Sequence, residues 1–421
     1  MRRFFSAYLI IIIILNLILP NYVYAKDNAP EIVGPTAVLI DFTSGQVLYD
    51  KNMNQKMYPA STTKILTAIL AIENGKLDDI VTASDNVTKV DGNSIFLSPG
   101  EKMTLRDLLY ALLLESANDA AIAIAEHIGG SVENFARMMN QKAKEIGAKN
   151  SNFVNPNGLP DQNHYSTPYD MALIGRYAME NKEFSKIVST LHYTIPPTNK
   201  MDKERDLWQS NRLLKPSSYH YDGADGIKTG YTTIAQQVLV ASAVRNNHRL
   251  ISVIMGDTGT NIWTDTIKLL DYGFNNFDLI KLNNQNELIT YATIGKSQFK
   301  LPLTAKNDFY YEIPKNEKDN IKSEIILNKN LKAPISKGNV LGNIVYKLNG
   351  KEIGSVELVA KESVYKNIWG TYYNESKTQV IKNNHIKFIN LLFGFVLILI
   401  AFVLLKKRRF KKKKNYIFSK Y

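Results

Sequence analysis

The sequence predicts an α+β protein: helices packed on a mostly antiparallel sheet, then a small all-β domain, then an apolar C-terminal helix. Three observations lead to this prediction. Strand-like and helix-like segments alternate over residues 31–277. Short β-rich runs separated by turn residues dominate residues 279–370. An apolar run over residues 388–405 reaches the lower limit of a membrane span.

Local signals support each part of this organisation. Thr104 can cap a helix with Asp107 at its third position, and apolar residues then continue to Leu114. The apolar runs 238–243 and 250–255 are typical of the two strands of a buried hairpin. In the second domain, an Asn-Gly pair joins two alternating strands, which is the strongest short signal for a hairpin.

Both ends of the chain indicate export and membrane attachment. Two arginines, an apolar run and the small residues before Ala25 are typical of a secretory signal over residues 1–25. A polar stalk (371–387) precedes the C-terminal apolar run, and a basic tail (406–421) follows it. Because basic flanks tend to stay in the cytoplasm, we expect a single-pass protein of the cell membrane whose body is extracytoplasmic.

Composition narrows the function further. The chain has 421 residues, of which 45% are hydrophobic and 22% charged, as in a globular protein with more than one domain. It has no cysteine, which excludes disulfides, thiol nucleophiles and cysteine metal sites. The six histidines lack metal-ligand spacing, so we expect neither a metal nor a cofactor.

The net charge of +13 is concentrated at the ends of the chain. Nine of the 52 Lys and Arg residues lie in the basic tail and two are Arg2 and Arg3, which leaves 41 against 39 acidic residues. A nucleic-acid partner would require basic residues clustered on the folded body. We therefore expect no nucleic-acid binding.

Three short motifs could carry chemistry, and the first is Ser61-Thr62-Thr63-Lys64, where a helix is expected to begin. Residues three apart share a helix face, so Lys64 would lie within reach of the Ser61 hydroxyl. A serine hydroxyl becomes a good nucleophile when a neighbouring base takes its proton. The start of a helix also offers backbone N–H groups to a developing oxyanion.

The second motif places Ser116 and Asn118 after an apolar helix, where they could bring a hydroxyl and an amide into one cleft; helix capping is the alternative. The third motif, Lys228-Thr229-Gly230, enters an apolar strand. Glycine allows a ligand to approach the strand backbone, and lysine and threonine can hold a carboxylate; a surface turn is the alternative. Each motif alone is a weak signal.

Taken together and in this order, the motifs resemble the signature of the serine penicillin-recognising fold: S-x-x-K, S-x-N and K-T-G. Residues 116–121, 155–161, 164–172 and 222–232 are similar to the D-alanyl-D-alanine carboxypeptidase branch, the low-molecular-weight penicillin-binding proteins. The resemblance extends over essentially the whole chain, because that branch also carries a β-rich second domain and a C-terminal membrane anchor. It implies a β-lactamase/transpeptidase-like catalytic domain.

The resemblance also implies an activity. The protein would be a serine-type D-Ala-D-Ala carboxypeptidase that removes the terminal D-alanine from peptidoglycan stem peptides through an acyl-enzyme, and β-lactams would acylate and inhibit it. The resemblance implies three catalytic residues: the nucleophile Ser61, the base Lys64 and the proton relay Ser116. It implies that Asn118 binds the peptide amide and that Lys228 and Thr229 bind the terminal carboxylate. It also places Gly230 and Tyr231 at the substrate, with the backbone N–H of Tyr231 sharing an oxyanion hole with that of Ser61.

Two segments depart from the family pattern. The stretch Ala235-Gln236-Gln237 stands where many relatives have Gly-x-Cys or Gly-x-Asn. Relatives also often place an arginine shortly after the strand that ends here at Gly256, and residues 257–263 contain none. If that arginine helps to hold the substrate carboxylate, the lysine and threonine of the third motif do more of the work.

Three other interpretations stay open. A β-lactamase needs a second base, such as the glutamate of a class A E-x-x-L-N loop, and no such segment lies between Asn118 and Lys228. An endopeptidase that cuts cross-links is not distinguished by the sequence. A catalytically silent penicillin-binding or wall-anchoring protein would usually have lost one of the five side chains expected for catalysis, and all five are present.

The expected base sets a condition on pH. A free lysine has a pKa of about 10.4, and Lys64 can accept a proton only when it is neutral. Burial and the nearby charge of Lys228 should both lower the pKa of Lys64. The sequence gives no size for either effect, so the expected acylation profile is a bell with an alkaline optimum.

Overall fold

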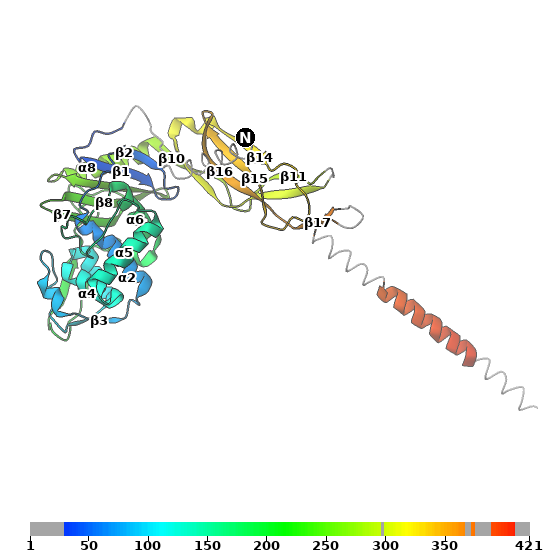
Figure 1. Cartoon of the computed structure of the whole chain (residues 1–421), viewed down its shortest axis with the longest axis horizontal. Coiled ribbons are helices and arrows are strands. Elements are labelled where there is room, and N and C mark those ends of the chain that lie inside the picture. Colours follow the sequence, from blue (N-terminus) through cyan, green and yellow to red (C-terminus); the bar gives the residue numbers. More distant parts are fainter. Residues whose placement is uncertain (1–28, 296–298, 367–371, 375–388, 409–421) are drawn as a thin grey trace, which may run out of the picture. The chain divides into compact units, whose positions relative to one another are not determined.

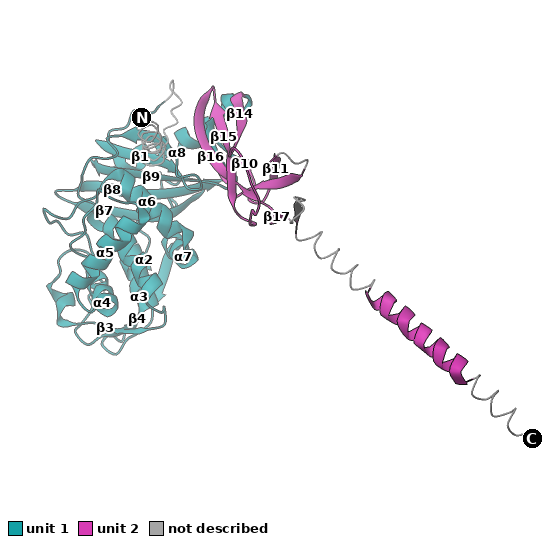
Figure 2. Ribbon diagram, turned by 45° about the vertical axis from the view of Figure 1, so that its right-hand side comes forward, with its two compact units in different colours: residues 1–280, 310–319 teal, residues 281–309, 320–421 magenta. Residues whose placement is uncertain are grey.

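The computed structural model describes residues 29–295, 299–366, 372–374 and 389–408. The predicted signal and most of the predicted stalk and basic tail lie outside these residues. The chain divides into two compact units, one made of Met1–Ile280 with Tyr310–Asp319 and the other of Lys281–Phe309 with Asn320–Tyr421 (Figure 2). The segment Tyr310–Asp319 therefore belongs with the first unit, although the sequence places it inside the β-rich region.

The first unit is built on a five-stranded sheet in the order β2-β1-β9-β8-β7, and every neighbouring pair is antiparallel. Its strands are β1 (Thr36–Asp41), β2 (Val47–Lys51), β7 (Ala224–Thr232), β8 (Gln236–Arg245) and β9 (His248–Asp257). The predicted hairpin of two buried strands is confirmed as β8 and β9. Asn246 and Asn247, which both have positive φ, join these strands, as a tight type I′ turn requires.

Helices cover both faces of this sheet (Figure 1). They are α2 (Lys64–Asn74), α3 (Leu105–Tyr110), α4 (Asn118–Gly129), α5 (Val132–Ile146), α6 (Pro168–Glu180), α7 (Lys182–Ser189) and α8 (Asn261–Asn276). Gly175 of α6 lies against Val240 and Ile251, whereas Gly273 of α8 lies against Leu39 and Leu250 on the opposite face. The predicted helix-on-sheet packing is confirmed, as a three-layer arrangement.

The predicted helix after Thr104 is confirmed at its start and changed at its end. The Thr104 hydroxyl accepts a hydrogen bond from the Asp107 backbone N–H at 3.1 Å, as an N-cap should. The α-helix ends at Tyr110, and the wider π-helical turn Ala111–Glu115 continues it. Such turns are concentrated at functional sites, and a 3.6-residue apolar pattern does not reveal them.

Three two-stranded ribbons complete the first unit and its edge: β3 (Ile80–Thr82) with β4 (Lys102–Thr104), β5 (His192–Ile195) with β6 (Arg205–Trp208), and β10 (Phe277–Asn283) with β13 (Phe309–Pro314). Short 3₁₀ segments lie at Ala60–Thr63, Asp85–Lys89 and Lys315–Asn320. The largest apolar core lies between the sheet and α2, α4, α5 and α6, so the start of α2 is held firmly from behind.

The described residues of the second unit up to Asn374 form strands and turns, so the predicted β-rich domain is confirmed as all-β. Its main sheet has the order β11-β12-β16-β15-β14, formed by β11 (Leu288–Thr293), β12 (Lys300–Ala305), β14 (Ile321–Leu327), β15 (Val340–Leu348) and β16 (Lys351–Ala360). A further ribbon pairs β17 (Val364–Lys366) with β18 (Tyr372–Asn374). Asn349 and Gly350 both have positive φ and close the predicted Asn-Gly hairpin between β15 and β16.

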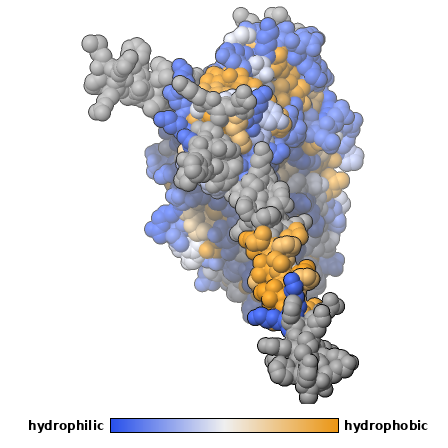
Figure 3. All heavy atoms as spheres, turned by 90° about the vertical axis from the view of Figure 1, so that its right-hand side faces the viewer, coloured by the Kyte–Doolittle hydropathy of each residue, from blue (hydrophilic) through white to orange (hydrophobic). Residues whose placement is uncertain are grey.

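The described C-terminal residues form one helix, Ile389–Arg408, whose most apolar 18-residue stretch has a mean hydropathy of 2.6. None of its most apolar stretch is buried inside the protein, and its apolar atoms are exposed in Figure 3. Its 20 residues are long enough to cross a bilayer. Residues 389–405 of the predicted span thus lie in a helix that is a candidate membrane span by length and composition, and residue 388 lies outside the described residues.

Candidate active site

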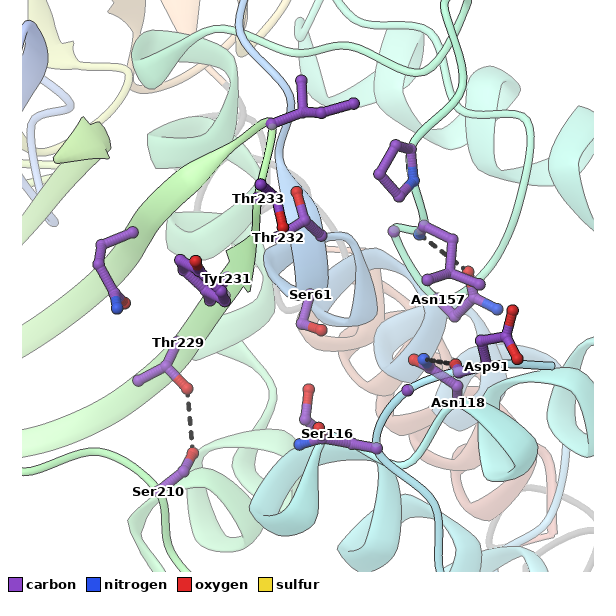
Figure 4. A pocket seen from close by; sticks show the side chains of 18 of the residues that line it. Ser61, Asp91, Ser116, Asn118, Asn157, Ser210, Thr229, Tyr231, Thr232 and Thr233 are labelled. Carbon is purple, nitrogen blue, oxygen red and sulfur yellow. Dashed lines mark hydrogen bonds between the residues drawn. The ribbon is translucent and has the colours of Figure 1, made fainter. Parts of the chain in front are cut away.

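A pocket of about 930 Å³ opens where the start of α2, the loop before α4 and the edge strand β7 meet (Figure 4). Six of the eight predicted site residues line it: Ser61, Ser116, Asn118, Thr229, Gly230 and Tyr231. The other two, Lys64 and Lys228, are buried side chains. The side chains of Ser61 and Ser116 point into the same space, and Thr229 faces them from β7 (Figure 4).

Ser61 lies in the 3₁₀ segment Ala60–Thr63, and Lys64 is the first residue of α2. The sequence predicted an ordinary helix start here, but the tighter turn still leaves the two side chains on one side. The Lys64 Nζ atom lies 3.0 Å from the Ser61 Oγ atom. The predicted contact between nucleophile and base is therefore present in the structure.

Lys64 is fully buried and has two further partners. Its Nζ donates to Asn118 Oδ1 and to the backbone carbonyl of Asn157, each at 2.6 Å. A carbonyl oxygen can only accept, so these bonds use two N–H groups. A neutral amine has two N–H groups and one lone pair. With both N–H groups used, the lone pair is left for the proton of the Ser61 hydroxyl.

The electrostatic setting favours that neutral form. Burial lowers the pKa of Lys64 well below its usual range, and the charge of Lys228 lowers it further, against an opposing effect of Asp119. Burial also lowers the pKa of Lys228, to about 7, although Glu115 opposes this shift. Two lysines that both lie below their ordinary pKa in one cleft are a feature of catalytic sites rather than of surface charge.

Ser116 follows the π-helical turn in a left-handed conformation with φ of 61°. Such a conformation is unusual for a non-glycine residue and is concentrated at functional sites. The Ser116 side chain is buried, and its Oγ has no hydrogen-bond partner among the described residues. Its backbone forms the left-handed C-cap of the π-helical turn and donates its N–H to the Ala111 carbonyl, whereas its side-chain hydroxyl makes no capping bond and remains available to a ligand.

Asn118 connects the loop to the lysine. Its Nδ2 donates to the backbone carbonyl of Asp91 at 2.6 Å, while its Oδ1 accepts from Lys64 (Figure 4). The backbone N–H of Asn118 donates to the Asn93 carbonyl at 2.7 Å. A primary amide has two donor and two acceptor positions, so one of each remains for a ligand. The side chain is therefore both a support for Lys64 and a potential peptide ligand.

Close backbone approach makes the site compact. An added Cβ at Gly230 would lie 2.9 Å from the Ser61 backbone nitrogen, and one at Gly158, where φ is +86°, would lie 1.8 Å from the Ala60 carbonyl oxygen. Only glycine fits at either position. Strand β7 and the loop at Gly158 thus enclose the turn that carries Ser61 from two sides.

His164 lies directly behind the site and was assigned no role from the sequence. Its Nδ1 accepts from the Val154 N–H at 3.2 Å, so Nε2 carries the proton toward the Thr63 hydroxyl, 2.9 Å away. Burial lowers the pKa of His164 to about 4. A neutral histidine whose two nitrogens are both occupied supports the nucleophile turn and does not act as its base.

The structure adds residues that sequence reasoning did not single out. Ser210 and Arg212 precede β7 and line the pocket together with Trp263 of α8. The hydroxyls of Ser210 and Thr229 lie 3.0 Å apart. The Arg212 guanidinium lies 5.9 Å from the Tyr219 ring centre and 6.0 Å from that of Trp263. Residues 257–263 contain no arginine, but Arg212 brings one to the pocket from another segment.

Comparisons with known proteins agree with this geometry. The D-alanyl-D-alanine carboxypeptidase family matches residues 24–259, and the C-terminal domain of penicillin-binding protein 5 matches residues 277–366. D-alanyl-D-alanine carboxypeptidase DacF of Bacillus subtilis is 38% identical over 339 residues, which cover 79% of this chain and 86% of the relative. DacA of Haemophilus influenzae is 36% identical over 358 residues, which cover 81% and 88%.

Solved structures extend the likeness to three dimensions. Penicillin-binding protein 5 of Haemophilus influenzae superposes with a TM-score of 0.73 at 35% identity, over 80% of this chain and 99% of that one. The Streptomyces K15 DD-transpeptidase superposes with a TM-score of 0.55 at 31% identity, over 59% of this chain and 99% of that one. The chain belongs to the D-alanyl-D-alanine carboxypeptidase family of serine peptidases and is a low-molecular-weight penicillin-binding protein.

Proposed function

We propose that Ser61 is the acylated nucleophile of this serine-type D-Ala-D-Ala carboxypeptidase and that neutral Lys64 is its general base. One observation carries the proposal: Lys64 Nζ lies 3.0 Å from Ser61 Oγ while two obligate acceptors take its N–H groups. This arrangement directs the lysine lone pair at the serine proton.

The remaining residues fit the steps of acyl transfer. Ser61 Oγ attacks the carbonyl carbon of the penultimate D-alanine, and its proton passes to Lys64. The backbone N–H groups of Ser61 and Tyr231 stabilise the oxyanion. Ser116, whose hydroxyl has no partner among the described residues, relays this proton: it gives its own proton to the leaving nitrogen and receives the one held by Lys64, which returns the lysine to its neutral form. Water then hydrolyses the acyl-enzyme and returns Ser61 to its free state.

The substrate class follows from the family and from the charges of the pocket. The named relatives are D-alanyl-D-alanine carboxypeptidases, so a peptidoglycan stem ending in D-Ala-D-Ala is the proposed substrate and a β-lactam the proposed covalent inhibitor. We propose that Asn118 binds the peptide amide, and that Lys228, Thr229 and Arg212 hold the terminal carboxylate. Water is the acceptor in a carboxypeptidase, whereas an amine would be the acceptor in a transpeptidase such as the Streptomyces neighbour.

Replacing Ser61 tests the nucleophile. Ser61→Ala should reduce D-alanine release from a D-Ala-D-Ala peptide by roughly 10³-fold or more, because no other group can form the acyl-enzyme. Covalent labelling by a fluorescent penicillin should disappear as well. Ser189→Ala, at an exposed serine of α7, is the control and should keep both signals. Labelling that persists in Ser61→Ala, with an unchanged circular dichroism spectrum, would contradict the assignment.

The pH dependence of acylation tests the base. The rate should rise as Lys64 loses its proton and fall as Lys228 loses the charge that attracts the carboxylate. Since burial lowers the pKa of both lysines, that of Lys228 to about 7, the optimum should lie below the pH at which exposed lysines titrate. Each limb belongs to the coupled pair of lysines.

The measurement is the second-order rate of penicillin acylation from about pH 5 to pH 10 for the wild type and for Lys228→Arg. Arginine keeps its charge over this range, so the alkaline fall should move or vanish. A flat wild-type profile would mean that Lys64 is not the titrating base.

Arg212 tests the carboxylate site. Arg212→Gln should lower kcat/KM for a peptide with a free C-terminal carboxylate by about tenfold to a hundredfold, because a charge-assisted hydrogen bond is lost. A peptide with a C-terminal carboxamide should lose far less. Arg137→Gln, at an exposed arginine of α5, is the matched control. Equal losses for both peptides would show that Arg212 does not bind the carboxylate.

We further propose that the helix Ile389–Arg408 anchors the protein and that the catalytic unit lies outside the cytoplasm after export by the predicted signal. A chain that lacks residues 1–25 and ends at Asn374 should remain in the aqueous fraction and keep peptide hydrolysis. The full chain should fractionate with membranes. A truncated chain that still sediments with membranes would mean that this helix is not the main anchor.

A further inference from the structure

Three titratable side chains meet inside the first unit, away from the catalytic pocket. Asp41 ends β1, His248 begins β9, and Glu312 lies on β13 within the segment Tyr310–Asp319. Ligand-type atoms of all three lie within 4.8 Å of one another. The positions are 207 and 64 residues apart in the chain, so no sequence spacing could have indicated them.

Local structure fixes each of the three residues. Asp41 Oδ1 accepts hydrogen bonds from the backbone N–H and the hydroxyl of Ser44, which leaves Oδ2 directed at the cluster. The Asn246-Asn247 turn places His248 at the start of its strand. The side chain of Gln46 binds both backbone groups of Glu312, donating to its carbonyl at 3.3 Å and accepting from its N–H at 2.6 Å.

The polar atoms that face one another are buried and unsatisfied. Asp41 and Glu312 are 0% exposed, and the His248 side chain is 13% exposed. Among the described residues, Asp41 Oδ2, both carboxylate oxygens of Glu312 and His248 Nε2 lack a hydrogen-bond partner of good geometry. The contacts between them are ion pairs, with His248 Nε2 at 2.6 Å from Glu312 Oε1 and at 3.5 Å from Asp41 Oδ2 when the histidine is protonated. Four such atoms in one buried place are costly unless something binds them.

Two carboxylates and one imidazole are a ligand set for a divalent cation. Two ionised carboxylates carry two negative charges, and a protonated histidine neutralises only one of them. A divalent cation beside a neutral histidine would neutralise both. Imidazole nitrogen and carboxylate oxygen together suit Zn²⁺, with Mn²⁺ the next match. We propose that Asp41, His248 and Glu312 form a binding site for a divalent cation, Zn²⁺ in the first place.

Solvent reaches one member of the trio. An open pocket of about 480 Å³ is lined by His248 together with Arg245, Phe274 and Lys315, and the two carboxylates lie behind the histidine, outside its lining. Zinc–ligand bonds of about 2.0–2.2 Å hold two ligand atoms roughly 3 Å or more apart, so binding would separate the Nε2 and Oε1 atoms that now crowd together.

The role of this site is structural. Strand β8 connects the two sites. Its residue Val238 pairs with Gly230 at the catalytic pocket, and its residue Arg245 pairs with His248 at the cluster. Seven residues of strand separate the two ends by roughly 20–25 Å. The cation would clamp the segment Tyr310–Asp319 to the central sheet and would take no part in acyl transfer.

Direct metal binding is the first test, on tag-free full-length protein in detergent. Equilibrium dialysis against Zn²⁺ with metal analysis should give one ion per chain for the wild type, and none for His248→Gln or Glu312→Gln. His220→Gln removes an exposed histidine that also pairs with an aspartate, and should keep the ion. Mn²⁺ and Mg²⁺ form parallel arms, in which Mn²⁺ should bind more weakly and Mg²⁺ least.

Thermal unfolding gives a second readout: three buried side chains that bind no metal would leave the Tm unchanged when zinc is added. Zinc should raise the Tm of the wild type and of His220→Gln by a few degrees at saturating concentration, and should not move Glu312→Gln. No bound ion in the wild type, or stoichiometric zinc that survives both ligand variants, would overturn the proposal.

Discussion

The burial of Lys64 is the constraint on which the site depends. A lysine with no exposed surface loses its solvation, and the structure compensates with two short bonds to carbonyl oxygens and one contact to Ser61. Those acceptors come from α4 and from the loop at Asn157. Both segments must therefore be in place before the N–H groups of the buried amine are satisfied, and the core behind α2 keeps them there.

Backbone contact, rather than side-chain chemistry, sets how close the walls of the pocket come. Gly230 brings the edge of the sheet against the Ser61 nitrogen, and Gly158 brings a loop against the Ala60 carbonyl. The left-handed Ser116 is a third such point, and it directs an unpartnered hydroxyl into the same space. The site thus concentrates conformations that ordinary residues avoid, as expected where geometry must be held for chemistry.

The sequence was sufficient for the architecture and the family because its signals are local. A few neighbouring residues are enough to predict the conformation at the Asn-Gly turn at Asn349, at the Thr104 cap and in the alternating strands. The three motifs, in their specific order, indicate the family. Non-local features were not accessible. The pocket position of Arg212, the partners of Lys64 from separate segments and the return of Tyr310–Asp319 to the first unit arise from tertiary packing. The same holds for the cluster of Asp41, His248 and Glu312, which no spacing rule connects.

The central claim is that burial and the charge of Lys228 hold the pKa of Lys64 well below that of an exposed lysine. Nitrogen-15 NMR of lysine-labelled protein measures this directly, with the Lys64 Nζ signal assigned by its loss in Lys64→Arg. The account predicts that this nitrogen titrates well below the range of the exposed lysines, because burial and Lys228 both disfavour its charge. A Lys64 Nζ that stays protonated up to the pH at which the exposed lysines titrate would contradict it, and Ser61 would then need another base.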